Sequence, residues 1–249
     1  MSAAPQDVRP SRRDRLREAT LREIVEAGRA QLRTVGAQGL TLSAVAREVG
    51  MSAPALYRYV DGVDGLVTLL VTEGYTSLAE RVERARDAVP ADDHGRRFDA
   101  AAGALRSWAK DDPAQYGLLF GSPLPGYAAP EDGPTTAVAA RAAGALWQVL
   151  VDARDAGRLG PPLVVEVEQA ALEVVTTHEG PGLQLPPEVR AAGWAALSLL
   201  LGSVAVEVFG HMPPCDGATA DALFRSRVAV ARRIVGLPDP LPDPLRVGR

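Results

Sequence analysis

The chain contains a single cysteine, Cys215, so it cannot form an internal disulfide. This is typical of proteins in a reducing cytosol, because disulfides persist mainly in oxidising compartments. The N-terminal residues are polar and rich in arginine, and they lack the apolar segment of a secretory signal. From His94 onward no alternating apolar pattern typical of β-strands appears, and no internal repeat is visible. We therefore expect an all-α protein of the cytoplasm.

The sequence also lacks the residue groupings on which catalysis depends. There is no nucleophile beside a base, no glycine-rich phosphate loop and no paired-carboxylate motif. Glu207 and His211 are four residues apart on a predicted helix, which is one element of a metal site. An ion pair or a hydrogen bond at a helix end explains this spacing more simply. We expect no enzymatic activity, no metal and no cofactor.

One apolar run, residues 191–209, is long enough to suggest a membrane span. Ser198 and Ser203 interrupt the run, Glu207 lies inside it, and no aromatic belt or cationic flank frames both of its ends. A helix that is apolar nearly all round must be covered on both sides. We therefore predict a dimer-interface helix and no membrane partner; burial within one chain is the alternative to the dimer.

Charge is distributed unevenly along the chain, whose net charge is −4 and whose residues are 47% hydrophobic. Residues 1–60 contain ten arginines against six acidic residues, so the acidic excess lies in residues 61–249. A basic N-terminal part joined to an acidic remainder is typical of a DNA reader with an appended sensor or dimerisation domain.

A helix-turn-helix pattern spans residues 41–59. Thr41 precedes the first helix, where a hydroxyl can accept from an unpaired backbone N–H, and Gly50 follows it, where glycine tolerates the left-handed conformation that ends a helix. Ser52 starts a second helix, and Pro54 lies in its first turn, where a missing N–H costs no hydrogen bond. The apolar residues of the first helix recur at intervals of three and four, which places them on one face: Leu42, Val45, Ala46 and Val49.

The second helix has the composition of one that enters a DNA major groove. Such a helix needs little bulk near the base edges and a donor that reaches guanine or phosphate, and Arg58 supplies the donor. Tyr57 and Tyr59 can offer hydroxyls to phosphates on either side of the groove. The alternative is a helical hairpin in an ordinary all-α core, with the tyrosines on its rim. The small residues at the exposed end of the helix are Ala53, Pro54 and Ala55.

Helical periodicity and Pro/Gly breaks divide the chain into four parts. Residues 1–15 lack apolar periodicity and form a predicted flexible basic arm, and residues 16–62 form the helix-turn-helix domain, which begins with a helix at 16–35. Residues 63–237 form a larger helical domain for ligand binding and dimerisation, and the proline-rich tail at 238–249 cannot be helical. The helices of the larger domain are predicted at 63–88, 95–110, 113–120, 134–157, 163–178, 187–210 and 217–236.

The N-terminal part of the chain resembles the DNA-binding domain of the TetR family of transcriptional regulators. The pattern that carries the resemblance is continuous: Ile24-Val25-Glu26-Ala27, Gly36, the unbroken stretch from Gly39 to Ser52, Leu56-Tyr57-Arg58-Tyr59-Val60, and Leu66. The resemblance implies an all-α homodimer whose two DNA-binding domains read the half-sites of an inverted repeat. It also implies two sets of contact residues: Thr41, Ser52, Tyr57 and Tyr59 to phosphates, and Ser43, Ala44, Ala53, Pro54, Ala55 and Arg58 to bases.

One position departs from the family pattern. The next helix usually begins with a lysine that grips phosphate, and Val63 stands there between Asp61 and Asp64. We therefore expect one phosphate contact to be absent, which lowers affinity and flattens its salt dependence by about one unit of slope. The arginine-rich arm can compensate, because arginine favours the negative potential of a minor groove; a plain disordered tail is the alternative.

The larger domain more weakly resembles the TetR-family C-terminal domain named for a Trp-His-Gly motif. The resemblance rests on the stretch from Asp112 to Phe120 and on the region after Trp194, although Ser198 stands where the histidine of the motif is expected. A sensor cavity in this domain would be apolar with a few polar anchors. Its candidate lining residues are aromatic, and each is equally suited to a simple core: Trp108, Tyr116, Phe120, Trp147 and Trp194.

These observations predict a DNA-binding transcriptional regulator, in the simplest case a repressor that a small apolar or amphipathic ligand releases from a palindromic operator. Its predicted partners are double-stranded DNA, a small-molecule effector and a second copy of the chain, which would bind through the helices at 187–210 and 217–236. The competing hypothesis is a helical dimer that has lost operator binding and acts as a ligand-binding or interaction protein. Val63 and its acidic neighbours support that alternative.

Overall fold

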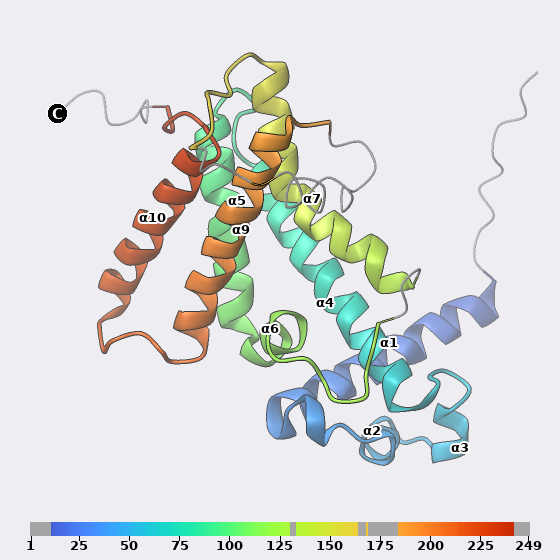
Figure 1. Ribbon diagram of the computed structural model, residues 1–249. Helices are drawn as coiled ribbons and strands as arrows, with labels where there is room; N and C mark the ends of the chain where they lie inside the picture. The colour runs from blue at the N-terminus through green and yellow to red at the C-terminus, as the bar shows by residue number, and fades with distance from the viewer. Residues whose placement is uncertain (1–10, 130–132, 164–167, 169–183, 242–249) are drawn as a thin grey trace, which may run out of the picture.

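The computed structural model describes residues 11–129, 133–163, 168 and 184–241, and within these ranges it contains helices and no strand (Figure 1). The predicted all-α fold is confirmed. All but two residues of the predicted helix at 163–178 lie outside the described ranges. The helices are α1 (Arg12–Val35), the short 3-10 helix η1 (Ala37–Gly39), α2 (Leu42–Val49), α3 (Ala53–Leu56), α4 (Gly62–Asp87), α5 (His94–Asp111), α6 (Pro113–Phe120), α7 (Pro134–Asp155), α9 (Pro187–Val208) and α10 (Gly217–Ile234).

A small apolar core holds the N-terminal domain together. It contains Ile24 from α1, Val45 from α2, Leu56 from α3 and Leu66 from α4, and each of these side chains is fully buried. Gly50 ends α2 with a φ of 70°, in the left-handed region that the sequence predicted for it. The apolar residues of the helix-turn-helix therefore point into this core, and its polar and small residues remain outside.

Two helix ends differ from the sequence prediction. α1 begins at Arg12, so the last residues of the predicted flexible arm are helical. The reason is a capping box, in which the Ser11 hydroxyl accepts from the backbone N–H of Asp14 and the Asp14 carboxylate accepts from the backbone N–H of Ser11. α3 ends at Leu56, because residues 57–59 continue as a turn in which the N–H of Tyr59 bonds to the carbonyl of Leu56 at 2.8 Å.

A second, larger core fills the C-terminal domain, and α4 crosses from one core to the other. The first half of α4 packs into the N-terminal core, and its second half, with Leu78 and Val82, packs into the larger core. Tyr75 lies between these halves and contacts both cores. At 1.5 Å per residue, the 26 residues of α4 span about 39 Å, enough to join the two domains rigidly (Figure 1).

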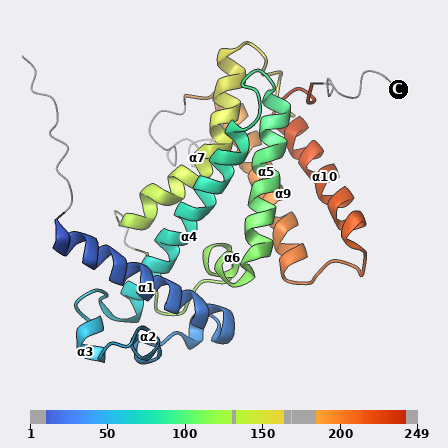
Figure 2. The same ribbon diagram turned by 180° about the vertical axis from the view of Figure 1, so that it is seen from behind.

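α6 lies between the same two cores, beside α1 and α4 (Figure 2). Ala114 and Leu118 pack against the N-terminal core, whereas Tyr116, Leu119 and Phe120 pack against the larger one. This short helix therefore contacts both domains along its whole length.

The described start of the proline-rich tail, residues 238–241, is not helical, as predicted, and it is attached to the larger domain. Arg232 donates from Nη2 to Oδ1 of Asp239 at 2.6 Å, and the backbone N–H of Leu241 donates to the carboxylate of Asp93.

Candidate functional site

The ten residues predicted to contact DNA all lie on the surface of the helix-turn-helix, at the lower end of the molecule in Figure 1. None of them is buried. Thr41, Ser43, Ser52, Ala53, Pro54, Tyr57 and Arg58 are exposed, and Ala44, Ala55 and Tyr59 are half-buried.

The helix-capping role predicted for two hydroxyls is wrong. Thr41 and Ser52 occupy the N-cap positions of α2 and α3, but neither side chain bonds to a helix N–H. The side-chain amide of Gln31 holds the backbone of Thr41 instead, by accepting from its N–H at 3.1 Å and donating to its carbonyl at 3.3 Å. Both hydroxyls therefore remain exposed and can donate to a phosphate oxygen, and Thr41 also adjoins the N-terminal N–H groups of α2.

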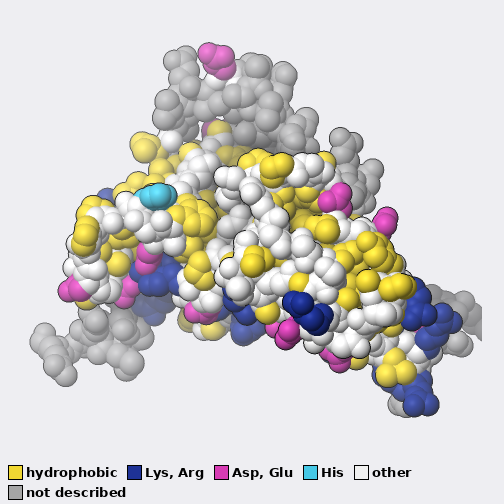
Figure 3. Space-filling view, turned by 90° about the horizontal axis from the view of Figure 1, so that it is seen from below, with side chains coloured by type: hydrophobic (Ala, Val, Ile, Leu, Met, Phe, Trp, Pro, Cys, Tyr) yellow, Lys and Arg dark blue, Asp and Glu magenta, His cyan; other side chains and the backbone are white. Residues whose placement is uncertain are grey.

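Arginine side chains gather at one end of this surface, the end at which α1 begins (Figure 3). Arg58, predicted to face bases, lies in a hollow together with arginines from the first turns of α1. Val63, which replaces the expected lysine, is 40% exposed in the first turn of α4, so no cation stands at that position.

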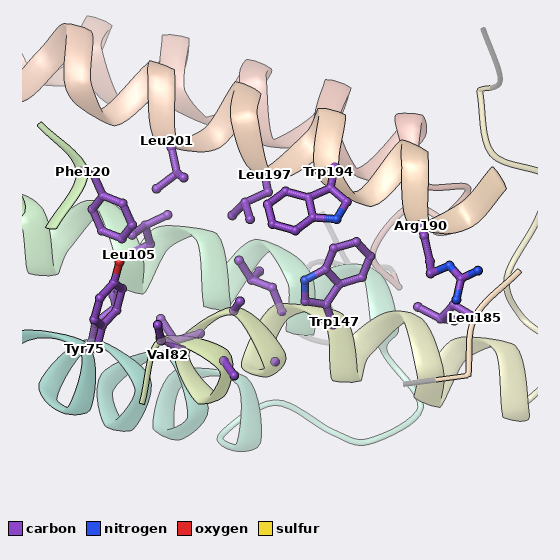
Figure 4. A pocket seen from close by; sticks show the side chains of 17 residues that line it. Tyr75, Val82, Leu105, Phe120, Trp147, Leu185, Arg190, Trp194, Leu197 and Leu201 are labelled. Carbon is purple, nitrogen blue, oxygen red and sulfur yellow. The ribbon is translucent and has the colours of Figure 1, made fainter. Parts of the chain in front are cut away.

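A cavity of about 380 Å³ lies between α4, α7 and α9 in the C-terminal domain (Figure 4). Its volume is in the range of sites for small organic ligands. Tyr75 and Phe120 meet edge to face at one end with ring centroids 5.8 Å apart; Trp147 and Trp194 meet 6.1 Å apart farther along, and Leu185 and Arg190 lie beyond them. The remaining wall is aliphatic apart from Arg190: Leu78, Val82, Leu105, Ala139, Ala140, Ala142, Ala143, Gly144, Leu146, Leu185, Leu197 and Leu201.

Three of the five aromatic residues predicted for a sensor cavity line this one, namely Phe120, Trp147 and Trp194. The other two belong to the packed core. Trp108 is 5% exposed and donates from Nε1 to the Ser77 hydroxyl at 2.9 Å. Tyr116 is 1% exposed, donates to the carbonyl of Leu201 at 2.7 Å, and has its pKa raised to about 12 by burial. Each side chain is committed to a partner that is distant in sequence.

Sequence reasoning missed the polar anchor of the cavity. The Tyr75 hydroxyl points toward Leu105 and Phe120 (Figure 4). It is protonated at neutral pH, because the ordinary pKa of a tyrosine is about 10 and burial raises the pKa of Tyr75 further. It can donate or accept a hydrogen bond inside a space whose wall is otherwise apolar except for Arg190. Tyr75 lies within the helix predicted at 63–88, and helical periodicity alone does not distinguish a core residue from a cavity residue.

A cluster of charged side chains, which we call the Asp112 clamp, joins the two domains. Asp112 Oδ2 accepts from Nη2 of Arg29 at 3.0 Å and from Nη2 of Arg33 at 2.7 Å, both from α1. Arg29 also pairs with Glu73 of α4 at 3.4 Å. Burial opposes the ionisation of Asp112, but the hydrogen bonds from Arg33 and Arg29 outweigh it, and the pKa of Asp112 is lowered.

The same aspartate is the N-cap of α6. Its Oδ1 accepts from the backbone N–H of Gln115 at 3.2 Å, and the Gln115 side chain donates from Nε2 to the carbonyl of Leu70 on α4 at 2.7 Å. Phe120, at the other end of α6, lines the cavity. α6 therefore has one end on the arginines of the DNA-binding domain and the other in the wall of the cavity.

Glu207, which the sequence placed four residues before His211, is engaged by two cations of α5. Glu207 forms a bidentate pair with Arg106, at 2.6 and 2.7 Å, and a second ion pair with Lys110 at 3.0 Å. The hydrogen bonds from Arg106 lower the pKa of Glu207 despite its partial burial. Among the residues that the structure describes, no group of three or more His, Cys, Asp or Glu side chains could hold a metal ion.

α9 and α10 pack together at the side of the molecule away from the start of α1 (Figure 1). By length and composition α9 could cross a membrane, and 33% of its most apolar window is buried within the chain. The outer faces of the two helices carry small or apolar residues at helical spacing: Ala195, Ser198 and Gly202 on α9, and Ala222, Ser226 and Val230 on α10.

Comparison with known proteins matches both parts of the chain. A family model described as bacterial regulatory proteins, tetR family, matches residues 24–75, and one described as the tetracyclin repressor-like C-terminal domain matches residues 98–231. The HTH-type transcriptional regulators Rv1816 of Mycobacterium tuberculosis and Mb1846 of Mycobacterium bovis are each 38% identical over 232 residues, which cover 90% of this chain and 97% of each relative.

Solved structures agree with these matches. The regulatory protein SCO4313 is 30% identical, with a TM-score of 0.66 over 89% of this chain and 98% of its own. A protein from Rhodococcus sp. RHA1 is 20% identical and shares the fold, with a TM-score of 0.64 over 94% of this chain and all of its own.

The Asp112 clamp should make the free energy of unfolding depend on pH. Because the folded-state pKa of Asp112 is lowered, its contribution is present above the ordinary carboxyl pKa of about 4 and is lost as the pH falls through the lowered value. We expect Asp112→Asn to reduce the unfolding free energy at pH 7 by about 1.5–3 kcal/mol, the range for hydrogen bonds to charged groups. Urea denaturation should show this gap closing toward pH 3.

Asp92→Asn is the matched control, since Asp92 is exposed and forms no ion pair within the described residues. It should leave stability unchanged at both pH values. A gap for Asp112→Asn that is equally large at pH 7 and pH 3 would contradict the role of its charge.

Proposed function

The chain belongs to the TetR family of transcriptional regulators, and on that basis we propose that it is a repressor. It binds a palindromic operator as a homodimer. It leaves the operator when a small apolar or amphipathic ligand enters the C-terminal cavity. It acts in the cytoplasm and without enzymatic activity. The observation that carries the proposal is the position of α6, which contacts the arginines of the DNA-binding domain through Asp112 and the cavity through Phe120.

Operator recognition is assigned to α3 and the residues around it. Ala53 and Pro54 leave the start of α3 free of bulk, so that the helix can approach base edges closely. The free hydroxyls of Thr41 and Ser52 and the exposed hydroxyl of Tyr57 are placed to meet phosphates on either side of the groove.

Ligand release follows from the contacts of α6. A ligand that fills the space beside Phe120 favours a position of α6 that makes room for it. Because Asp112 holds Arg29 and Arg33, a shift of α6 moves α1 or breaks the clamp. Either outcome alters the orientation of the DNA-binding domain, so DNA and ligand favour different conformers, as coupling requires.

The ligand proposed for this cavity is a neutral aromatic molecule with one hydrogen-bonding group. The two aromatic pairs supply ring contacts, and the protonated Tyr75 hydroxyl supplies a polar anchor. The residues that α7 contributes to the cavity wall, among them Ala143 and Gly144, are small, so they leave room for a ligand.

Selection from a random duplex library tests operator binding. We expect the purified protein to enrich an inverted repeat, and Ala53→Glu to abolish binding to it, because a carboxylate at the start of α3 meets the phosphate backbone and the base edges. Ala91→Glu, on an exposed loop after α4, should bind as the wild type does. Failure to enrich any sequence would favour the alternative, a ligand-binding dimer without an operator.

Filling the cavity tests ligand binding. A Cβ added at Gly144 meets no atom within 4 Å, so Gly144→Leu can occupy the cavity without disturbing the fold. We expect N-phenyl-1-naphthylamine, a neutral aromatic fluorophore, to bind the wild type once per protomer, and its affinity to fall at least about tenfold in the variant, whose melting temperature is unchanged or higher because a cavity is filled.

Gly103→Leu serves as the control for this experiment, since Gly103 of α5 also has open space around it but does not line the cavity. It should bind the fluorophore as the wild type does. Equal affinity in the wild type and in Gly144→Leu would place the fluorophore elsewhere and contradict the assignment.

The dimer is assigned to the outer faces of α9 and α10, where small side chains allow close helix approach. Gly202 has no atom within 4 Å of an added Cβ, so Gly202→Glu is tolerated by the single chain but places a charge in the proposed interface. Sedimentation velocity should show a dimeric wild type and a monomeric variant, with Gly103→Glu still dimeric. A monomeric wild type, or a dimer that Gly202→Glu leaves intact, would refute this interface.

A further inference from the structure

Four arginines from two separate segments form a hollow beside the helix-turn-helix. Arg12, Arg13 and Arg17 come from the first turns of α1, and Arg58 follows α3. Arg17 is held in place on both sides: its guanidinium carbon lies 5.2 Å from the centre of the Tyr59 ring, and its Nη1 donates to the backbone carbonyl of Arg58 at 3.4 Å. The hollow is therefore part of the folded domain.

The four arginines of the hollow outnumber the acidic residues beside them, Asp14 and Glu18. Within the described residues none of the four forms an ion pair, and all four are exposed. Asp14 accepts hydrogen bonds from the hydroxyl and the backbone N–H of Ser11, and its charge also attracts that of the neighbouring Arg13.

The arginines near the C-terminal end of α1 do form ion pairs. There, Arg29 and Arg33 are bound by Asp112 and Glu73. Exposed arginines without an acidic partner cost self-repulsion, which an anion relieves.

The position of the hollow identifies the anion. It adjoins the last turn after α3, and the arginines gather at the end of the DNA-facing surface in Figure 3. α9 and α10, which the proposed dimer uses, lie on the opposite side of the molecule (Figure 1). In a two-fold dimer the hollow of each protomer therefore lies on the outer side of its own half-site.

We propose that this hollow binds a phosphate group of the operator backbone outside the half-site read by α3, and that it substitutes for the phosphate grip that the apolar side chain of Val63 cannot provide. The inference rests on the proposed operator binding and adds a contact that depends on the first turns of α1, outside the helix-turn-helix. Guanidinium groups suit this role because they bind phosphate oxygens in a bidentate manner. Tyr59 contributes to the hollow by holding Arg17.

The test compares two duplexes that carry the selected inverted repeat, one ending at the half-sites and one extended by a helical turn on each side. Anisotropy titrations at several salt concentrations give the affinity and its salt slope. For the wild type we expect tighter binding to the extended duplex and a slope steeper by about 1.8, since each of two phosphates contributes about 0.9. For the double variant Arg12→Ala, Arg13→Ala we expect the two duplexes to bind alike.

Two further variants make the result specific. Arg22→Ala removes one charge from α1 at a position outside the hollow and should keep the gain from the extended duplex. Arg12→Lys, Arg13→Lys should restore most of the salt slope, because lysine retains the charge.

A double alanine variant that gains as much from the flanks as the wild type would overturn the inference, although it would leave operator binding by α3 intact. Absence of binding to both duplexes by the wild type would instead overturn the proposed function itself.

Discussion

The ionised carboxylate of Asp112 connects α1 with α6 at the junction of the two domains. One of its oxygens is shared by two arginines of α1, and the other caps α6. Its backbone N–H meanwhile bonds to the carbonyl of Trp108, at the end of α5. A carboxylate that is 5% exposed is stable in this position only because these donors compensate for the missing hydration. Loss of Arg29 or Arg33 would leave the buried Asp112 carboxylate with one charged donor fewer.

The clamp matters because the two domains share no other charged contact of this kind within the described residues. α4 joins the cores through continuous apolar packing, which resists bending, whereas α6 is short and rests between the cores. Gly74 of α4 allows the close approach, since a Cβ there would collide with the Gln115 side chain. A short helix tied to both domains by a few polar contacts can take two positions at a modest cost, which is what an allosteric element requires.

The sequence predicted the helices well wherever local chemistry marks their ends. Pro113, Pro134 and Pro187 each stand at the first position of a helix, where proline is favoured, and the predicted starts coincide with the observed ones. The start of α1 was missed because the capping box at Ser11 and Asp14 precedes any apolar periodicity. The exposed surface of the helix-turn-helix also followed from local pattern, since a helix of eight residues shows its buried face directly.

The cavity and the clamp depend on contacts that no local pattern encodes. Trp108 and Tyr116 belong to the core because Ser77 and Leu201 accept their hydrogen bonds, and those partners lie on other helices. Asp112 was visible only as part of a stretch that resembles a known C-terminal domain. Its arginine partners lie 79 and 83 residues away, so only the folded chain reveals the pair.

The central claim is that occupation of the cavity reaches the DNA-binding domain through the Asp112 clamp. The most direct measurement is the operator affinity with and without saturating N-phenyl-1-naphthylamine, for the wild type and for Asp112→Ala, with fluorophore binding measured separately for each protein. The account predicts that the fluorophore weakens operator binding by the wild type by about fivefold or more, the lower end of typical coupling, and has little effect on the variant although the variant still binds it. Equal weakening in both proteins, or none in the wild type, would contradict the account.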